Sequence, residues 1–352
     1  MKNKILMCGN EACGEGAMLA GCTFYAGYPI TPQNELTAYM AKRMYETSGV
    51  FIQAESELAA INMVFGAACA GARAMTSSSS PGISLKQEGI SYMAGCELPC
   101  VIVNMQRGGP GLGNIAPSQG DYFQAVKGGG HGDYKLIVLA PASAQELMDY
   151  TQFAFELADK YRNPVMILGD GLLGQMMEPV SIPAAKDEPR IFEKPWALTG
   201  CRGRKPNIIR SLILAEGALE EHNKRLQEKF KLITQSEVKS EALNIKDSDI
   251  VLVAYGSVAR IARASMEMAR AKGLKVGLIR PVTVWPFPDK TIEDACVSAK
   301  KFLVVEMSAG QMVEDVRLAV NGRVPVEFYG RMGGGIPSEE EILSKIEAIS
   351  RL

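Results

Sequence analysis

Short, continuous apolar runs alternate with longer helical stretches along this chain, and that alternation constrains the fold more than any other feature. In the first 170 residues the apolar runs lie at 22–28, 50–54, 73–77, 100–105, 136–140 and 164–169. The helical stretches lie at 9–21, 32–46, 56–72, 83–95, 118–127 and 143–162. Strands that are apolar along their whole length and alternate with helices are typical of a parallel sheet covered on both faces. The sequence therefore predicts an α/β fold.

The same alternation restarts after a stretch of different character. Residues 181–247 are broken by prolines, and 215–237 within them has the pattern of an amphipathic helix. Its apolar stripe consists of Leu219, Leu226, Phe230 and Ile233. We therefore expect a domain over 1–180, a connector over 181–247 and a smaller α/β domain over 248–352.

The smaller domain has its own strand and helix signals. Its last helix is predicted to start with a capping box formed by Ser338 and Glu341. Strand-like runs lie at 249–255, 274–279, 302–306 and 324–328, and helices are expected at 257–271, 288–299, 309–320 and 338–351.

Charge and hydropathy exclude several classes of partner. The chain has 38 basic and 39 acidic side chains and a net charge of −1. Without a long basic run, neither nucleic acid nor an anionic membrane is expected as its main partner. The apolar runs are strand-sized and too short to span a membrane, and the one at the N-terminus is too short for a signal peptide. We expect a cytoplasmic protein.

The cysteines do not form a metal-binding pattern. None of the eight belongs to a Cys-x-x-Cys pair, and His131 and His222 are the only histidines. A zinc site or an iron–sulfur cluster held by this chain alone is therefore not expected. Most of the cysteines are predicted to be small buried hydrophobes.

Glu57 is a candidate catalytic residue because it falls on an apolar helix face. A helix that begins at Ser56 carries Ile61, Val64, Phe65 and Ala68 on the same face as Glu57. A carboxylate on such a face is costly without a partner, which makes Glu57 a candidate acid–base group. The alternative is a first-turn glutamate that interacts with the helix dipole, a role that Glu55 would also suit.

Two further residues follow strands that should end at the same edge of the sheet. Thr31, in the segment Tyr-Pro-Ile-Thr-Pro, could be a helix N-cap with Pro32 at the first helical position, or it could face a bound anion. Arg107 ends another strand beside a glycine-rich loop, a position that suits carboxylate binding, with an ordinary surface arginine as the alternative. The small polar residues at 77–80 end a third strand at the same rim.

A dinucleotide-binding fingerprint is suggested by Gly111-x-Gly113-x-x-Ala116 but is incomplete. The glycines begin several residues after the strand, and Pro117 separates them from a helix. No acidic residue at a suitable strand end completes the motif. We do not expect a dinucleotide here.

Taken together, these segments resemble the α-type subunit of the 2-oxoacid:ferredoxin oxidoreductases. The resemblance spans nearly the whole chain and is carried by GNEACGEGAMLAGCTFYAGYPITPQNE, QAESELAAINMVFGAACAGARAMTSSSSPGISLKQEGISYMAGCELPCVIVNMQRGGPGLGN, GGGHGDYKLIVLAPAS, RNPVMILGDGLLGQMMEP and VGLIRPVTVWPFP. Residues 33–35 and the segment SSSSPGISLKQEGISY look closest to the branched-chain (2-oxoisovalerate) member. The 2-oxoglutarate members are the main alternative, and a non-catalytic scaffold subunit is a remoter one.

The resemblance implies an activity that several chains share. The first domain would be the pyrimidine-binding domain of a thiamine-diphosphate enzyme, and the second would resemble the transketolase C-terminal domain. A β-type chain would bind the diphosphate and Mg²⁺, and γ-type and ferredoxin-like chains, the latter with iron–sulfur clusters, would complete the complex. The reaction implied is the oxidative decarboxylation of a 2-oxoacid, with coenzyme A as acyl acceptor and ferredoxin as electron acceptor.

By the same resemblance, three residues have expected roles. Glu57 matches the glutamate that hydrogen-bonds N1′ of the aminopyrimidine, and Thr31 and Arg107 match residues that meet the substrate. Gly169-Asp170-Gly171 is similar to the start of a diphosphate–metal motif, but no Asn follows at the required spacing. We therefore interpret Asp170 as part of a strand-end turn, with no metal ligand expected in this chain, and His131 as an ordinary loop residue.

Overall fold

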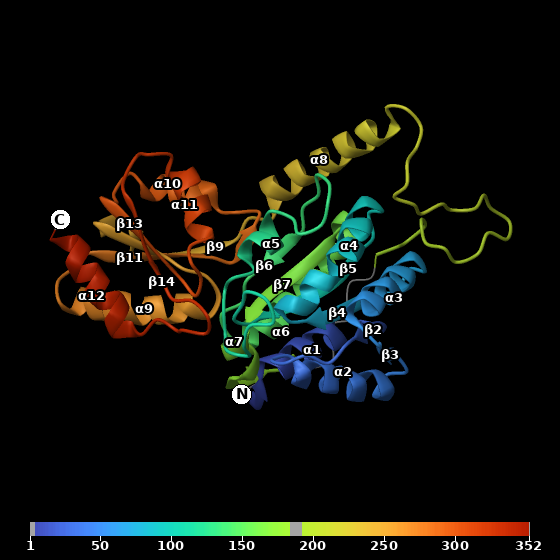
Figure 1. The fold of residues 1–352 in the computed structure, drawn as a ribbon, viewed down its shortest axis with the longest axis horizontal. Coiled ribbons are helices and arrows are strands. Elements are labelled where there is room, and N and C mark those ends of the chain that lie inside the picture. Colours follow the sequence, from blue (N-terminus) through green and yellow to red (C-terminus); the bar gives the residue numbers. More distant parts are fainter. Residues whose placement is uncertain (1–3, 184–191, 352) are drawn as a thin grey trace.

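Two α/β domains lie side by side in the computed structural model, which describes residues 4–183 and 192–351 (Figure 1). Residues 184–191 of the predicted connector lie outside the described part of the chain. The α/β architecture predicted from the alternation of strands and helices is confirmed.

A seven-stranded sheet forms the centre of the first domain, in the order β12-β6-β7-β5-β4-β2-β3. Its strands are parallel except for β12, which pairs antiparallel with β6. All residues of the two central strands β5 and β7 are buried, because both faces of the sheet are covered. The strands are β2 (Phe24–Gly27), β3 (Val50–Gln53), β4 (Ala74–Ser78), β5 (Cys100–Gln106), β6 (Ile137–Leu139), β7 (Pro164–Asp170) and β12 (Thr283–Trp285).

The helices of this domain form two packed groups. One group is α1 (Gly9–Leu19), α2 (Asn34–Glu46) and α6 (Ala144–Tyr161), and the other is α3 (Glu57–Cys69) and α4 (Ser80–Gly95). The short helices α5 (Tyr122–Val126) and α7 (Gly171–Gln175) fill connections between strands. The helix predicted over 118–127 is therefore only five residues long.

Two strands outside the main sheets had no counterpart in the sequence analysis. β1 (Lys4–Cys8) pairs antiparallel with β8 (Met177–Ser181), which immediately follows the first domain's last helix. Ile5, Leu6 and Met177 are exposed on this small sheet. Only Met7 and Cys8 of β1 and Val180 of β8 are buried, so the two segments lack the continuous apolar run that marks a strand of a sheet covered on both faces.

The second domain is built on a five-stranded sheet in the order β14-β13-β10-β11-β9. Four strands are parallel, and β9 is antiparallel to β11. Its elements are β9 (Ser240–Leu243), the 3₁₀ turn η1 (Ile245–Asp247), β10 (Ile250–Val253), α9 (Gly256–Ala271), β11 (Val276–Pro281), α10 (Asp289–Ala295), β13 (Lys301–Glu306), α11 (Met312–Val320), β14 (Val326–Gly330) and α12 (Glu339–Ser350). The predicted capping box of Ser338 and Glu341 starts α12.

Two strands contradict the simple division of the sequence. Ser240–Leu243 fell within the predicted connector, but as β9 they form an edge of the second sheet. Thr283–Trp285 come after β11 in the second domain, but as β12 they extend the sheet of the first. Pairing with a strand distant in the sequence decides both positions, β11 for β9 and β6 for β12, and a local pattern does not contain that information.

Helix α8 (Ala218–Ser236) lies along the first domain, as Figure 1 shows in yellow above the sheet. Leu226, Phe230 and Ile233 of the predicted stripe are buried, whereas Leu219 is 47% exposed. The Phe230 ring meets Trp285 of β12 edge-on, with 5.8 Å between ring centroids. α8 therefore packs on the strand that links the two domains.

Candidate functional site

The carboxyl ends of four neighbouring parallel strands define one edge of the first sheet. β5, β4, β2 and β3 are consecutive in the sheet, and Arg107, Ser79, Tyr28 and Ala54 follow at or near their ends. Such an edge is where open α/β sheets bind ligands. It brings together the regions of the three residues predicted from the sequence.

Glu57 lies at the first turn of α3 and is buried, with 6% of its surface exposed. The predicted helix start is observed, since the Ser56 side chain accepts a hydrogen bond from the Ala59 amide at 3.1 Å. Glu55, by contrast, is exposed. The carboxylate of Glu57 therefore faces the protein interior.

This carboxylate can pack directly against α4 because position 82 is a glycine. A first side-chain carbon placed on Gly82 of α4 would lie 2.6 Å from Glu57 Oε1, and closer still to Ser78 Oγ. Gly89, two turns further along α4, approaches α3 in the same way, since a carbon there would lie 2.7 Å from Ile61 Cγ1. The two helices are thus in close contact along a glycine stripe.

Lys86 lies between these two glycines on the same helix face, and from the sequence alone it is a candidate second cation just outside the rim segments. Its side chain is fully buried, and Nζ donates hydrogen bonds to Thr76 Oγ1 and the Ser77 carbonyl of β4. Burial lowers the pKa of Lys86 from its usual 10.5 to about 7, with Glu57 opposing that shift. A lysine in an otherwise apolar helix face was the available signal.

A network of buried polar side chains underlies the same edge. Ser77 Oγ donates to Gln33 Oε1 at 2.6 Å and is also hydrogen-bonded to the Tyr25 hydroxyl. Thr37 Oγ1 donates to the same Gln33 oxygen at 3.1 Å. This network fixes the start of α2 against β2 and β4.

Two buried hydroxyls at this edge have no hydrogen-bond partner within the described part of the chain. They are Ser78 Oγ, which lies beside Glu57, and Ser79 Oγ. Buried hydroxyls are normally satisfied, so unpartnered ones call for an external group. A polar heterocycle next to Glu57 fits that requirement.

Thr31 and Arg107 lie side by side. One terminal guanidinium nitrogen of Arg107 donates to the Thr31 carbonyl at 3.0 Å, and the other donates to the Leu112 carbonyl at 3.0 Å. The Nε atom is buried without a partner in the described residues. A carboxylate can reach the buried Nε only if the surrounding side chains move, whereas each terminal nitrogen keeps a second N–H besides the one that it donates to a carbonyl.

The N-cap role considered for Thr31 is wrong. α2 starts at Asn34 with Gln33 as its N-cap residue, so Pro32 is not at the first helical position. Instead Asn10 of α1 holds this turn, donating 2.8 Å hydrogen bonds to the Pro32 carbonyl and to Glu35 Oε2. This tertiary contact delays the helix by two residues and leaves Thr31 in the loop.

Asp170 has a structural role. It is the N-cap of α7, where Oδ1 accepts hydrogen bonds from the amides of Leu172 and Leu173, both at 3.0 Å. Oδ2 accepts one from Ser257 of the second domain at 2.6 Å. Burial raises its pKa, and these hydrogen bonds oppose the rise. In residues 4–183 and 192–351, no cluster of three or more His, Cys, Asp or Glu side chains could hold a metal ion.

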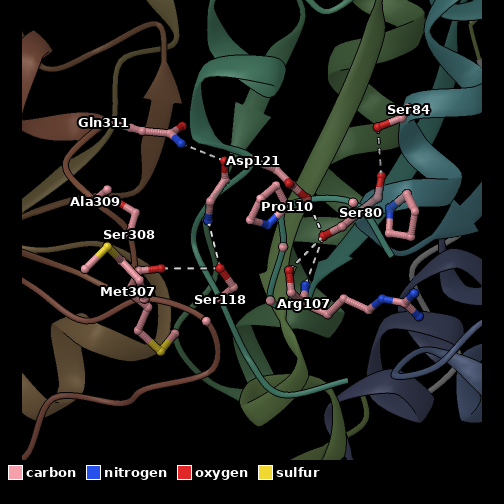
Figure 2. A pocket seen from close by; sticks show the side chains of 17 residues that line it. Ser80, Ser84, Arg107, Pro110, Ser118, Asp121, Met307, Ser308, Ala309 and Gln311 are labelled. Atoms are coloured by element: carbon pink, nitrogen blue, oxygen red, sulfur yellow. Dashed lines mark hydrogen bonds between the residues drawn. The ribbon is translucent and has the colours of Figure 1, made fainter. Parts of the chain in front are cut away.

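The glycine-rich loop after β5 lines a separate cavity of about 450 Å³ between the domains, shown in Figure 2. Ser80, Asp121 and Pro110 line it on one side, and Ser308 and Gln311 on the other. The guanidinium of Arg107 points away from this cavity, which only its main chain reaches (Figure 2). Gly111 and Gly113 both have positive φ and open no helix, so the incomplete dinucleotide fingerprint is a loop.

His131 lies apart from Glu57, Thr31 and Arg107, in a loop that faces α8. Its ring meets Tyr92 edge-on with 6.5 Å between centroids, and its carbonyl accepts a hydrogen bond from Ser91. Together with His222 it lines a groove of about 580 Å³ between α4 and α8 that none of the three predicted site residues lines.

Comparison with solved structures first defines the class of fold. A split-gene transketolase, an inactive β4 tetramer, matches 97% of this chain and 97% of its own with a TM-score of 0.60 at 13% identity. That likeness shows the fold alone: two α/β domains of the transketolase type. A 2-oxoglutarate:ferredoxin oxidoreductase from Magnetococcus marinus, solved with 2-oxoglutarate, coenzyme A and succinyl-CoA bound, is more similar. It matches with a TM-score of 0.88 at 28% identity. The match covers 99% of this chain but 65% of that one.

Sequence comparison then defines the family. Residues 15–243 match the family described as pyruvate flavodoxin/ferredoxin oxidoreductase, thiamine diphosphate-binding, and 248–342 match core domain II of pyruvate:ferredoxin oxidoreductase. The chain therefore belongs to the 2-oxoacid:ferredoxin oxidoreductase family, as its motifs predicted.

Named relatives differ in substrate. Ketoisovalerate oxidoreductase subunit VorB of Methanothermobacter thermautotrophicus is 53% identical over 97% of both chains. The 2-oxoglutarate synthase subunit KorA of Methanothermobacter marburgensis is 38% identical over 98% of this chain and 99% of its own.

No helix within the described ranges is long and apolar enough to cross a membrane.

Proposed function

We propose that this chain is the α-type subunit of a thiamine-diphosphate-dependent oxidoreductase that acts on branched-chain 2-oxoacids. The overall reaction converts 2-oxoisovalerate, coenzyme A and two oxidised ferredoxins to isobutyryl-CoA, CO₂, a proton and two reduced ferredoxins. The observation that carries the proposal is the buried Glu57 carboxylate, which packs against Gly82 of α4 beside two unpartnered hydroxyls. A scaffold subunit has no need of such an acid.

The residues of this chain would hold one end of the cofactor. When bound, thiamine diphosphate supplies the carbanion chemistry that removes CO₂ from a 2-oxoacid. Glu57 would exchange a proton with N1′ of the aminopyrimidine, and Ser78 would lie beside it. Thr31 and Arg107 would orient the substrate carboxylate at the rim.

The remaining parts of the cofactor site are assigned to partner chains. Both carboxylate oxygens of Asp170 accept hydrogen bonds, Oδ1 from amides of α7 and Oδ2 from Ser257, which supports a structural role rather than Mg²⁺ binding. A β-type chain would bind the diphosphate and Mg²⁺, and a γ-type chain and a ferredoxin-like iron–sulfur chain would complete a cytoplasmic complex. Within this chain, 1–180 would be the pyrimidine-binding unit, 181–247 a connector and 248–352 the transketolase C-terminal-like unit.

Substrate preference follows from the charges at the rim. The segments 28–34, 76–84 and 104–116 contain Arg107 as their only basic residue. Lys86, the next candidate, is fully buried and directed at β4. The second carboxylate of 2-oxoglutarate would thus lack a partner from this chain, at a cost on the order of several kcal/mol. The KorA relatives keep 2-oxoglutarate as the second candidate.

The test is a comparison of kcat/KM for 2-oxoisovalerate and 2-oxoglutarate in the assembled complex with a low-potential electron acceptor. We expect a preference for 2-oxoisovalerate of at least about tenfold, since each 1.4 kcal/mol corresponds to that factor. An equal or higher kcat/KM for 2-oxoglutarate would overturn the assignment of substrate. No turnover with any 2-oxoacid would overturn the assignment of reaction.

A further inference from the structure

Lys86 is a buried cation that the proposed chemistry does not yet use. Gly82, Lys86 and Gly89 are spaced four and three residues apart on α4, so they form one stripe on one face of the helix. The glycine at one end of this stripe meets Glu57 and the glycine at the other end meets Ile61. The stem of Lys86 therefore leaves α4 between these two contacts with α3, and its Nζ reaches β4.

The hydrogen bonds of Lys86 hold it in this place. Nζ is anchored on Thr76 Oγ1 and the Ser77 carbonyl, two residues at the end of β4. These residues directly precede Ser78, whose hydroxyl lies beside Gly82 and Glu57. The anchor and the carboxylate thus belong to one buried cluster formed by α3, α4 and β4.

We propose that Lys86 is a positioning residue for Glu57: its buried ammonium is the counter-ion that favours the ionised carboxylate and thereby transfer of the Glu57 proton to N1′. The proposal rests on the proposed function of Glu57. The charges balance, because the proton leaves a neutral carboxylic acid and the resulting carboxylate then faces a cation. No direct hydrogen bond or ion pair joins Lys86 and Glu57 in the described structure, so the cation acts across the buried cluster, where a low dielectric makes such an interaction stronger than in water.

The groups that interact with Lys86 electrostatically are few. They are Glu57 of α3, which raises the pKa of the lysine, and the thiol of Cys100 on β5. Burial raises the pKa of Cys100, so this thiol stays neutral near pH 7. Glu57 is therefore the anionic partner of Lys86 among the described residues.

The pair predicts a pH dependence with a definite sign. The folded-state pKa of Lys86 is lowered to about 7, while the unfolded chain holds this proton up to its usual 10.5. The free energy of unfolding therefore rises as the pH increases from about 7 to 10.5. Below about pH 7 the lysine is charged in both the folded and the unfolded chain, so the folded chain bears the full cost of burying the cation. Removing the Glu57 charge lowers the lysine pKa further, so Glu57→Gln should depress the melting temperature more at about pH 6 than at about pH 9.

The first measurement is a double-mutant cycle of thermal stability on the full chain, using Glu57→Gln, Lys86→Met and both together. Methionine keeps the length of the lysine stem without its charge. We expect the extra loss of melting temperature at low pH in Glu57→Gln to disappear when Lys86→Met is added. Should Lys86→Met fail to fold, the pH dependence of Glu57→Gln against wild type gives the same information. Additive effects at both pH values would overturn the proposal.

The second measurement is exchange of the cofactor C2 proton in the assembled complex. Lys86→Met should slow this exchange by at least about tenfold, which is less than the roughly 10²–10⁴-fold effect of a group that transfers the proton itself, because Lys86 acts through Glu57. Lys229→Met is the matched control, because Lys229 is also largely buried and paired with a glutamate, Glu97, but lies on α8. It should exchange at the wild-type rate.

The two measurements separate this proposal from the function on which it rests. Coupling in the cycle together with wild-type exchange in Lys86→Met would overturn the proposal, because the pair would then be structural only. A wild-type complex that does not exchange the C2 proton would overturn the proposed function, and the role of Lys86 with it.

Discussion

At the scale of single residues, the site depends on the missing side chain of Gly82 as much as on the carboxylate of Glu57. Gly82 lies in the first turn of α4 without an unusual backbone conformation, so its role is to leave space. That room lets the Glu57 carboxylate and the Ser78 hydroxyl pack against α4 at the start of α3. Lys86 and Ser78 complete its polar surroundings.

Replacing Glu57 by glutamine tests the acid–base role directly. Glutamine keeps the size of the side chain but cannot pass a proton to N1′, so C2-proton exchange in the assembled complex should fall by about 10²–10⁴-fold. Glu55→Gln is the control, since Glu55 is exposed two residues away. Wild-type exchange in Glu57→Gln would refute the assignment.

Replacing Gly82 by alanine tests the space itself. The added carbon would collide with Ser78 and Glu57, so we expect a loss of about 1–3 kcal/mol in stability. Thiamine diphosphate binding by the complex should weaken in the same variant, as calorimetry would show. Gly66→Ala in α3 is the matched control: nothing lies within 4 Å of the added carbon, so the variant should be as stable as wild type or about 0.5–1 kcal/mol more stable. Equal behaviour of the two variants would contradict this account.

At the scale of elements, the connection between the two domains depends on one strand, β12, and on the helix that covers it, α8. β12 leaves the second domain to pair with β6, and α8 covers it through the Phe230–Trp285 contact. The carboxyl end of α8 is also held by Glu237, which accepts hydrogen bonds from Lys160 and Tyr161 at 2.6 Å. α8 thus stabilises the connection more than it serves the site.

Truncating Phe230 should reveal this role. Phe230→Ala removes a buried ring, which typically costs about 3–5 kcal/mol of unfolding free energy. Leu232→Ala, two residues along the same helix and 58% exposed, should change stability by no more than about 0.5 kcal/mol. Urea denaturation of the full chain measures both. A loss of similar size in the two variants would show that α8 does not pack as described.

At the scale of the whole molecule, buried hydrogen bonds join the two domains. Gln119 is buried, its Nε2 donates to the Tyr255 carbonyl at 2.9 Å and its Oε1 accepts from the Met307 amide at 3.0 Å. Tyr122 donates to Asp315 at 2.7 Å, and Ser257 donates to Asp170. The relative position of the domains is therefore set by specific polar contacts as well as by apolar packing.

Gln119→Ala tests how far these contacts hold the domains together. It leaves a buried carbonyl and a buried amide without partners, which should lower the unfolding free energy by about 1–3 kcal/mol for each group. We also expect the variant to unfold in a broader transition than wild type in calorimetry, because the two domains become less tightly coupled. Gln227→Ala on the exposed face of α8 should have no effect on either quantity, and an unchanged transition in Gln119→Ala would disprove the coupling.

The sequence by itself determined the fold class, most of the elements, the family and the position of Glu57 on a buried helix face. It could do so because strand and helix periodicity, an N-cap serine and long motifs are all local in the chain. Strand boundaries agree within a few residues for β4, β5 and β7, where both faces are buried and the apolar run is continuous.

Only the tertiary structure decided the features that depend on distant partners. β9 and β12 are short strands whose place is set by pairing with β11 and with β6 of the other domain, respectively, and β1 and β8 pair with each other. Asn10, 22 residues before Pro32, shifts the start of α2 and leaves Thr31 in a loop. The position of Lys86 in an otherwise apolar helix face is visible in the sequence, but its burial is not. The close approach of α4 to α3 at Gly82 and Gly89 buries it beside Glu57, because a helix without side chains at those positions can come near enough to exclude water.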